Sequence, residues 1–115
     1  MSEDCLFCKV VSGDVPAQVL REGQRTVVFR DINPQAPTHV LVIPRQHHAD
    51  VAALAAADEA ALAELLREAH AVATDEGVAE SGYRVVFNTG AGAGQTVPHA
   101  HAHVLGGRGL RWPPG

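Results

Sequence analysis

An α+β domain with an antiparallel sheet, one long amphipathic helix and a short N-terminal helix is the fold class that the sequence predicts. The 115 residues amount to a single domain, residues 1–115, of globular composition with 46% hydrophobic and 19% charged residues. Short β-branched runs lie on both sides of a long alanine-rich segment. One long helix provides too few crossovers for a doubly wound parallel sheet, which favours the antiparallel arrangement.

The first half of the chain is expected to form a short helix, a hairpin and a buried strand. Apolar residues four apart, Leu6 with Val10 and Phe7 with Val11, favour a helix that ends near Gly13. Two brief β-branched runs separated by a polar segment are typical of a hairpin, and the continuous run VLVI predicts a strand buried on both faces. The expected bounds are residues 5–13 for the helix, 19–21 and 26–29 for the hairpin strands, 31–38 for a loop and 40–43 for the buried strand.

The second half begins with the main helix. Eleven alanines fall within residues 51–73 without Gly or Pro, with Asp58 as a candidate N-cap and Gly77 just beyond the C-terminal end. An apolar stripe indicates that this helix packs on the sheet, and it comprises Leu62, Leu65, Leu66, Ala69 and Val72. Strands are expected at residues 83–88 and 99–105, a glycine loop at 90–94 and an extended tail at 108–115.

Charge and hydropathy restrict the partners. A net charge of −4 argues against duplex DNA or an anionic membrane as the main partner. No stretch approaches the ~18 apolar residues of a membrane span, and the start MSEDCLFCKV has acids where a signal peptide would be basic. We therefore expect a cytoplasmic protein that binds neither nucleic acid nor membrane, with any phosphate site built without a basic patch.

Three histidines alternate with small residues near the C-terminus. On a strand, His99, His101 and His103 would line one face about 7 Å apart. Such a row can be a solvated polar face, a metal site or a catalytic cluster.

A glycine-rich segment, GAGAGQT at residues 90–96, precedes the histidines. Its glycines permit positive φ, so successive N–H groups could converge on an anion, with Thr96 adding a hydroxyl. The segment is neither a Rossmann fingerprint nor a Walker A motif, because the glycine spacing differs and no Gly-Lys-Ser/Thr is present. By itself it is equally a plain hairpin loop.

Read together, QTVPHAHAHVLGGR resembles the histidine triad (HIT) superfamily, in which His-x-His-x-His precedes small and apolar residues. The segments DINPQAPTHVLVIPRQH and HVLGGRGLRWPPG look like the HINT branch, the nucleotide-binding phosphoramidases, and the start CLFCK extends the likeness over nearly the whole chain. The resemblance implies a HIT-like homodimer that binds purine nucleotides. It also implies hydrolysis at the α-phosphorus, at P–N bonds of nucleoside phosphoramidates or in acyl-adenylates.

The resemblance further implies a role for each matching residue. His101 would be the nucleophile, His103 would contact the phosphate, His39 would complete the site and Asp31 would hold the ribose hydroxyls. The phosphate or leaving group would be held by Asn88, Gly94, Gln95 and Thr96. The walls of the base pocket would be Leu6, Phe7, Val10, Phe29 and Ile32, each of which is equally a candidate for the core.

The implied chemistry suits these residue types. A neutral imidazole can attack phosphorus and form a nucleotidyl-histidine that water cleaves, without a metal. Neighbouring histidine, amide and loop N–H groups can spread the charge on the phosphate oxygens. The alternatives are a zinc hydrolase that uses all three triad histidines as ligands, a dinucleoside polyphosphate hydrolase, and a non-catalytic nucleotide-binding or partner-binding module.

A CxxC pair at the start of the chain can be buried packing, a redox pair or metal ligands. Resemblance to bacterial HIT proteins implies a zinc ion with the ligands Cys5, Cys8, His47 and His99, a closed tetrahedral set and hence structural. His48 could compete with His47 for the metal. His70, on the long helix, is expected at the surface.

The tail ends in RWPPG and contains the only tryptophan, Trp112. It can pack loosely on its own subunit or reach across a dimer. The resemblance favours the second case, in which Trp112 would lie near the partner's site and influence which leaving group is accepted.

Overall fold

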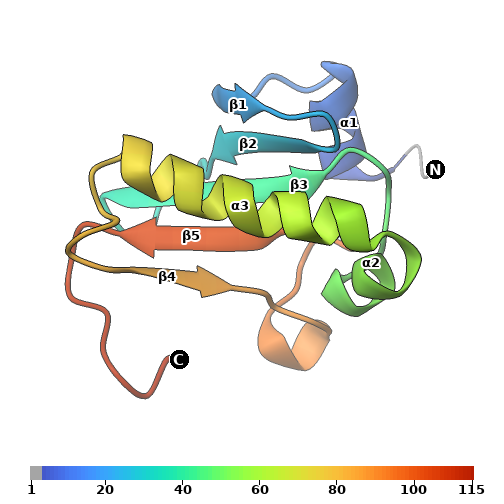
Figure 1. Ribbon diagram of the computed structural model, residues 1–115. Coiled ribbons are helices and arrows are strands. Elements are labelled where there is room, and N and C mark those ends of the chain that lie inside the picture. The colour runs from blue at the N-terminus through green and yellow to red at the C-terminus, as the bar shows by residue number, and fades with distance from the viewer. Residues whose placement is uncertain (1–3) are drawn as a thin grey trace.

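A computed structural model of the protein describes residues 4–115 and contains one five-stranded sheet with helices on both faces (Figure 1). The first three residues of the expected domain lie outside this range. The strands are β1 (Val19–Glu22), β2 (Thr26–Arg30), β3 (Thr38–Pro44), β4 (Tyr83–Val86) and β5 (Ala102–Gly106). Their order is β1-β2-β3-β5-β4, and every neighbouring pair is antiparallel, as expected for the α+β class.

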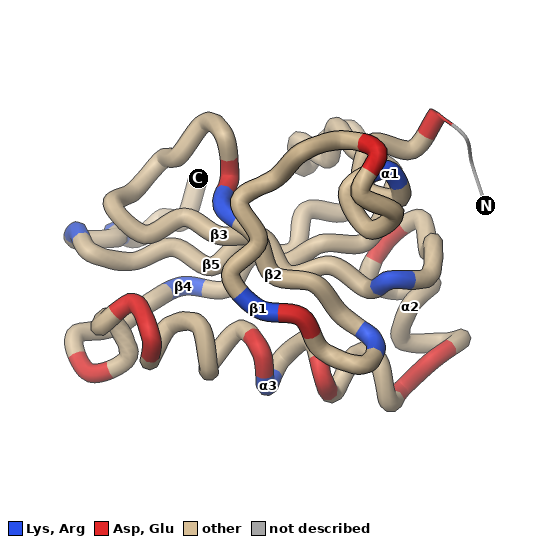
Figure 2. The backbone as a smooth tube through the Cα atoms, turned by 90° about the horizontal axis from the view of Figure 1, so that it is seen from above, with Lys and Arg blue, Asp and Glu red and all other residues tan. Residues whose placement is uncertain are grey.

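In the described part of the chain, four helical segments accompany this sheet. They are α1 (Leu6–Ser12), α2 (Val51–Ala57), α3 (Glu59–Asp75) and the 3-10 turn η1 (Ala91–Ala93). Seen from above, α1 and α3 lie on opposite faces of the strands, and acidic residues recur along α3 (Figure 2). Helix α1 has Cys5 as its N-cap and Gly13, at φ 86°, as its C-cap, which confirms the expected short helix.

The alanine-rich segment is divided at Asp58, although its composition predicts one main helix. Asp58 has a non-helical backbone, with φ −152° and ψ 84°. Its N–H donates to Leu54 O and ends α2, while its carboxylate accepts from Ala61 N at 3.0 Å and begins α3. The short polar side chain therefore competes with the helix and caps the second one, as expected for an N-cap.

Alternation along the central strand divides the core into two clusters. All seven residues of β3 are buried, which confirms the strand expected to be buried on both faces. Val40 and Val42 pack with α3, whereas Leu41 and Ile43 pack with α1 and its Phe7. The second cluster also contains both cysteines, so the metal candidates are continuous with the core beneath α1.

The bounds of all five strands differ from those expected, and the differences at β4 and β5 bear on the site. Strands β1 and β2 each extend one residue further than expected, and β3 runs from residue 38 to residue 44 instead of 40–43. The last strand begins at Ala102, not at residue 99, and β4 ends at Val86 instead of residue 88. Residues 99–101 leave the sheet because their backbone groups have other partners. His99 N donates to Val97 O at 2.8 Å and Ala100 N donates to His48 O at 2.7 Å. The prediction that three imidazoles share one face of a strand is therefore wrong, since only His103 belongs to β5.

Candidate active site and metal centre

A cavity of about 290 Å³ opens between α1, β2 and the start of β5. Of the residues expected to bind substrate, those that line it are Leu6, Phe7, Val10, Phe29, Asp31, Ile32, Thr96, His101 and His103. The cavity is also lined by six residues that the sequence patterns do not predict: Val15, Pro16, Ala17, Arg30, Leu41 and Val97. Val15 to Ala17 form an irregular connection, and no periodicity in the sequence marks such a wall.

The histidine expected to be the nucleophile is oriented by its own backbone. His101 is buried, with Nδ1 at 2.7 Å from His99 O. A carbonyl oxygen only accepts, so Nδ1 carries the proton of the neutral ring and Nε2 keeps its lone pair. The Phe7 ring packs edge-to-face with both His99 and His101, with ring centroids 6.0 Å and 5.0 Å away. The geometry thus provides a nucleophilic nitrogen on a cavity wall.

A second pair of histidines lies beside it. Gln35 N–H donates to His39 Nδ1 at 3.0 Å, so the hydrogen of neutral His39 is on Nε2. That Nε2 lies 2.9 Å from His103 Nδ1 and 3.3 Å from Asp31 Oδ2. His103 therefore accepts at Nδ1 and presents a hydrogen on Nε2. The chain of bonds fixes the tautomers of both rings.

Burial keeps this pair neutral at pH 7. Burial, together with the neighbouring His101 and His39, lowers the pKa of His103 to about 4, although Asp31 opposes the shift. Burial also lowers the pKa of His39, against the opposing effect of Asp31. Asp31, His39 and His103 are close enough to hold a metal ion. The hydrogen on His39 Nε2 argues against this, because a ligand nitrogen must be unprotonated.

Arg30 contributes a cation to the cavity wall, but its charge is already paired. Its guanidinium makes a bidentate ion pair with Glu76 at 2.7 Å and 2.9 Å, which raises the pKa of Arg30 above its usual range. A bound phosphate must therefore rely on neutral donors, as the composition suggested.

The glycine loop is closed on itself. Gly90 and Gly94 have φ of 85° and 88°, which explains glycine at both positions. Gly94 N donates to Ala91 O at 3.0 Å, and Gln95 N donates to Gly90 O at 3.1 Å. The amide of Gly94, expected to bind phosphate, is thus used within the loop, whereas the neighbouring Thr96 lines the cavity.

Five of the expected site residues lie away from the cavity walls. His39 stands behind His103, and Asn88, Gly94, Gln95 and Trp112 are also not among the lining residues. Trp112 is 83% exposed, on a tail whose Leu110 and Arg111 carbonyls accept from Arg84.

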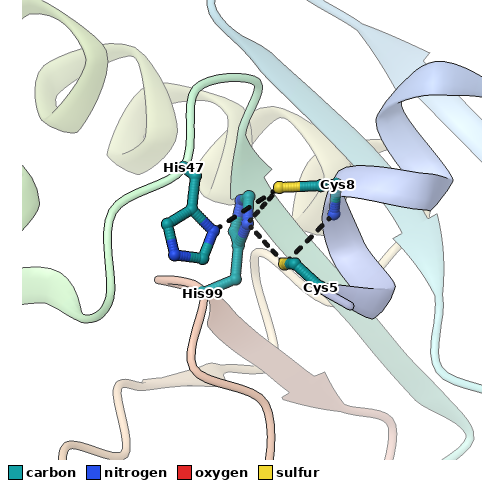
Figure 3. A group of neighbouring side chains, drawn as sticks. All are labelled: Cys5, Cys8, His47 and His99. Atoms are coloured by element: carbon teal, nitrogen blue, oxygen red, sulfur yellow. Dashed lines mark hydrogen bonds between the residues drawn. The ribbon is translucent and has the colours of Figure 1, made fainter. Parts of the chain in front are cut away.

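The four residues expected to bind zinc converge from α1, the loop after β3 and the bend before β5 (Figure 3). Cys5 Sγ lies 3.3 Å and Cys8 Sγ 3.6 Å from His99 Nδ1, and Cys8 Sγ lies 3.4 Å from His47 Nδ1. A tetrahedral zinc with its usual bond lengths separates sulfur and nitrogen ligands by roughly 3.5 Å. The cluster therefore has the spacing of a metal centre.

The tautomer of His99 agrees with this assignment. His99 is fully buried and its Nε2 lies 2.9 Å from Pro44 O, so Nε2 carries the hydrogen and Nδ1 faces the cysteines as a free ligand. Burial lowers the pKa of His99, which favours the neutral ring that a metal needs. His48 is outside the cluster, and His70 is exposed with Nδ1 at 2.9 Å from Tyr83 Oη.

The described residues form two candidate metal groups, and neither combines His99, His101 and His103. His99 belongs to the cysteine cluster and His103 to the pair with His39. The alternative of a three-histidine metal site therefore has no support from the geometry. Within residues 4–115, no helix is both long and apolar enough to cross a membrane.

Comparisons of sequence and structure find similar proteins over nearly the whole chain. Residues 12–110 match the model of the HIT domain family. The chain is 41% identical to the purine nucleoside phosphoramidase of Escherichia coli over 96% of this chain and 92% of that protein. It is 46% identical to a 14 kDa zinc-binding protein of Zea mays, over 96% and 87%. A solved HIT family hydrolase from Legionella pneumophila superposes with a TM-score of 0.93 at 49% identity, covering 97% of this chain and all of that one.

Proposed function

The chain belongs to the HIT domain family, and from this premise we propose that it hydrolyses purine nucleoside 5′-phosphoramidates at the P–N bond, or the corresponding acyl-phosphate bond. The observation that carries the proposal is the 2.7 Å contact between His101 Nδ1 and His99 O, which leaves Nε2 as a nucleophile on the cavity wall. The likeness to a purine nucleoside phosphoramidase supports the same bond as the target.

The reaction proceeds in two displacements. His101 Nε2 attacks the α-phosphorus, the P–N bond breaks, and the leaving nitrogen takes a proton from solvent and departs as the amine. Water then attacks the nucleotidyl-histidine, which releases the nucleoside monophosphate, returns a proton to solvent and restores neutral His101. The reaction needs no metal.

The neighbouring groups stabilise charge on the phosphorus oxygens. His103 donates from Nε2, with its tautomer set by His39, and Thr96 adds a hydroxyl. Asn88 is a further candidate donor once substrate is bound, whereas the amides of Gly94 and its neighbours are already bonded within the loop. Because Arg30 is held by Glu76, this stabilisation comes from dipoles and not from a free cation.

The nucleoside occupies the apolar part of the cavity. The purine packs between α1 and β2, against the walls formed by Leu6, Phe7, Val10, Phe29 and Ile32. Asp31 holds the ribose hydroxyls with Oδ1, which accepts from Asn33 N at 2.8 Å, and with Oδ2 beside His39.

The Cys5, Cys8, His47 and His99 cluster holds a structural zinc ion. Its spacing and the tautomer of His99 support this, as does the likeness to a zinc-binding protein. When bound, the metal cross-links α1 to the bend before β5, and it leaves no open coordination position for chemistry. We further propose a cytoplasmic homodimer in which the tail with Trp112 approaches the partner's site.

Turnover tests the function directly. One preparation is assayed against adenosine 5′-phosphoramidates and against dinucleoside polyphosphates. The proposal requires a higher kcat/KM for the phosphoramidates. A preference for the polyphosphates would replace it with the other hydrolase activity, and AMP binding without turnover of either would identify a non-catalytic module.

A further inference from the structure

Both ends of the Gln95 side-chain amide form hydrogen bonds with backbone atoms. Its Oε1 accepts from Gly90 N at 2.9 Å, and its Nε2 donates to Ala49 O at 2.8 Å and to Val97 O at 3.1 Å. Gln95 does not line the cavity, whereas the next two residues, Thr96 and Val97, do. The side chain therefore acts from behind the cavity wall and cannot contact substrate in this arrangement.

The two acceptors of Nε2 connect the glycine loop to the segment of the nucleophile. Ala49 O accepts from Gln95, and the preceding carbonyl, His48 O, accepts from Ala100 N at 2.7 Å. Two consecutive carbonyls thus hold the residues that come immediately before Thr96 and His101. Val97 O also accepts from His99 N at 2.8 Å, which joins the same two segments a second time.

We propose that Gln95 is a positioning residue that fixes Thr96 relative to His101 by docking the glycine loop on Ala49 O, beside the carbonyl that holds Ala100. The proposal rests on the proposed function, because Thr96 is assigned there to the phosphate. The hydrogen bond from Gly90 N adds a second function, since it closes the loop into a ring with the bond from Gln95 N to Gly90 O. A loop closed in this way is already ordered, so it loses little conformational entropy when phosphate binds.

The substitution Gln95→Glu distinguishes the hydrogen bond accepted by Oε1 from the two donated by Nε2. The glutamate keeps an oxygen for Gly90 N but loses both donors and places a carboxylate against two carbonyl oxygens. We expect kcat to fall roughly 10- to 100-fold, because a displacement of about 1 Å near the reacting atoms has that effect. Gln95→Leu, which has no hydrogen bonds to offer, should show a similar loss. The matched control is Gln24→Glu at an exposed glutamine, which should keep the wild-type kcat.

A double-mutant cycle with Thr96→Ala tests whether Gln95 acts through Thr96. If it does, Gln95→Glu should lower kcat less than about threefold in the Thr96→Ala background, because the displaced hydroxyl is already absent. The proposal would be overturned if the losses of kcat in the two single variants multiplied in the double variant, or if Gln95→Glu left kcat unchanged. It would also be overturned by losses of kcat that only follow a lower fraction of folded protein.

Hydrogen exchange of the wild type provides a test that needs no variant. Gly90 is exposed, so protection of its amide would follow from the bond to Gln95 Oε1, and rapid exchange would overturn the proposal. The proposed function fails separately, if wild-type protein does not turn over phosphoramidates. An active wild type with a fast-exchanging Gly90 or with multiplying losses would refute the role of Gln95 alone.

Discussion

Replacing Cys5 and Cys8 together by serine should remove one zinc ion per chain and lower the melting temperature. The metal would join α1 to the bend at His99, and α1 carries Phe7 and Val10 into the core beneath the sheet. A ligand present at about 100 times its dissociation constant stabilises the native state by about 2.7 kcal/mol. A domain of this size shifts its melting temperature by roughly 4 °C per kcal/mol, so we expect a decrease of about 10 °C.

Metal analysis and thermal unfolding measure both effects. Wild-type protein should contain one zinc per chain and lose the same stability when a chelator removes it. His48→Ala is the matched control, because His48 adjoins His47 in sequence but lies outside the cluster. Metal-free wild-type protein, with an unchanged melting temperature in the double serine variant, would refute the reasoning and leave the cysteines as core packing.

Activity should outlast the zinc, because His101 and His103 are outside the cysteine cluster. If chelation abolished all turnover while the fold stayed intact, the metal-free mechanism proposed for His101 would be refuted.

Two further predictions concern pH and the tail. In the folded protein, the pKa of His103 is lowered to about 4 and that of His39 is also lowered. Histidines of the unfolded chain have pKa values near 6.5, so between about pH 4 and 6.5 the unfolded chain binds more protons than the folded protein does. The free energy of unfolding should therefore fall as pH decreases from about 6.5 to 4, which urea titrations would show; a flat profile that is unchanged in His103→Asn would contradict it. Removing residues 111–115 should alter the ranking of phosphoramidates by kcat/KM with AMP affinity little changed. Equal losses for every substrate, or none, would show that Trp112 takes no part in selecting the leaving group.

Local patterns were sufficient to predict most of the elements. The buried run around Val40 and the cap at Asp58 were both recognised, because each depends on a few neighbouring residues. The division of the alanine-rich segment was missed, since composition favours helix on both sides of Asp58. The start of the last strand was also misplaced, because the alternation of histidines is the same whether residues 99–101 pair in a sheet or not.

The site required contacts that are distant in sequence. His99 bonds to Cys5, which is 94 residues away, and no local pattern indicates that His99 turns from His101 toward the cysteines. Only the resemblance to the HIT family suggested that ligand set. The tautomers of the site histidines depend on hydrogen bonds with backbone atoms of His99, Gln35 and Pro44. These contacts form only in the folded chain and leave no pattern in the sequence.

Rapid acid-free quenching of wild-type protein during turnover of a phosphorus-labelled adenosine phosphoramidate would detect the covalent nucleotidyl-histidine. We expect acid-labile label on histidine in the wild type. We also expect no label and no turnover in His101→Asn, which should still bind AMP because the cavity walls and Thr96 remain. Wild-type kcat in His101→Asn, or turnover by the wild type without label on His101 at any reaction time, would contradict the covalent mechanism.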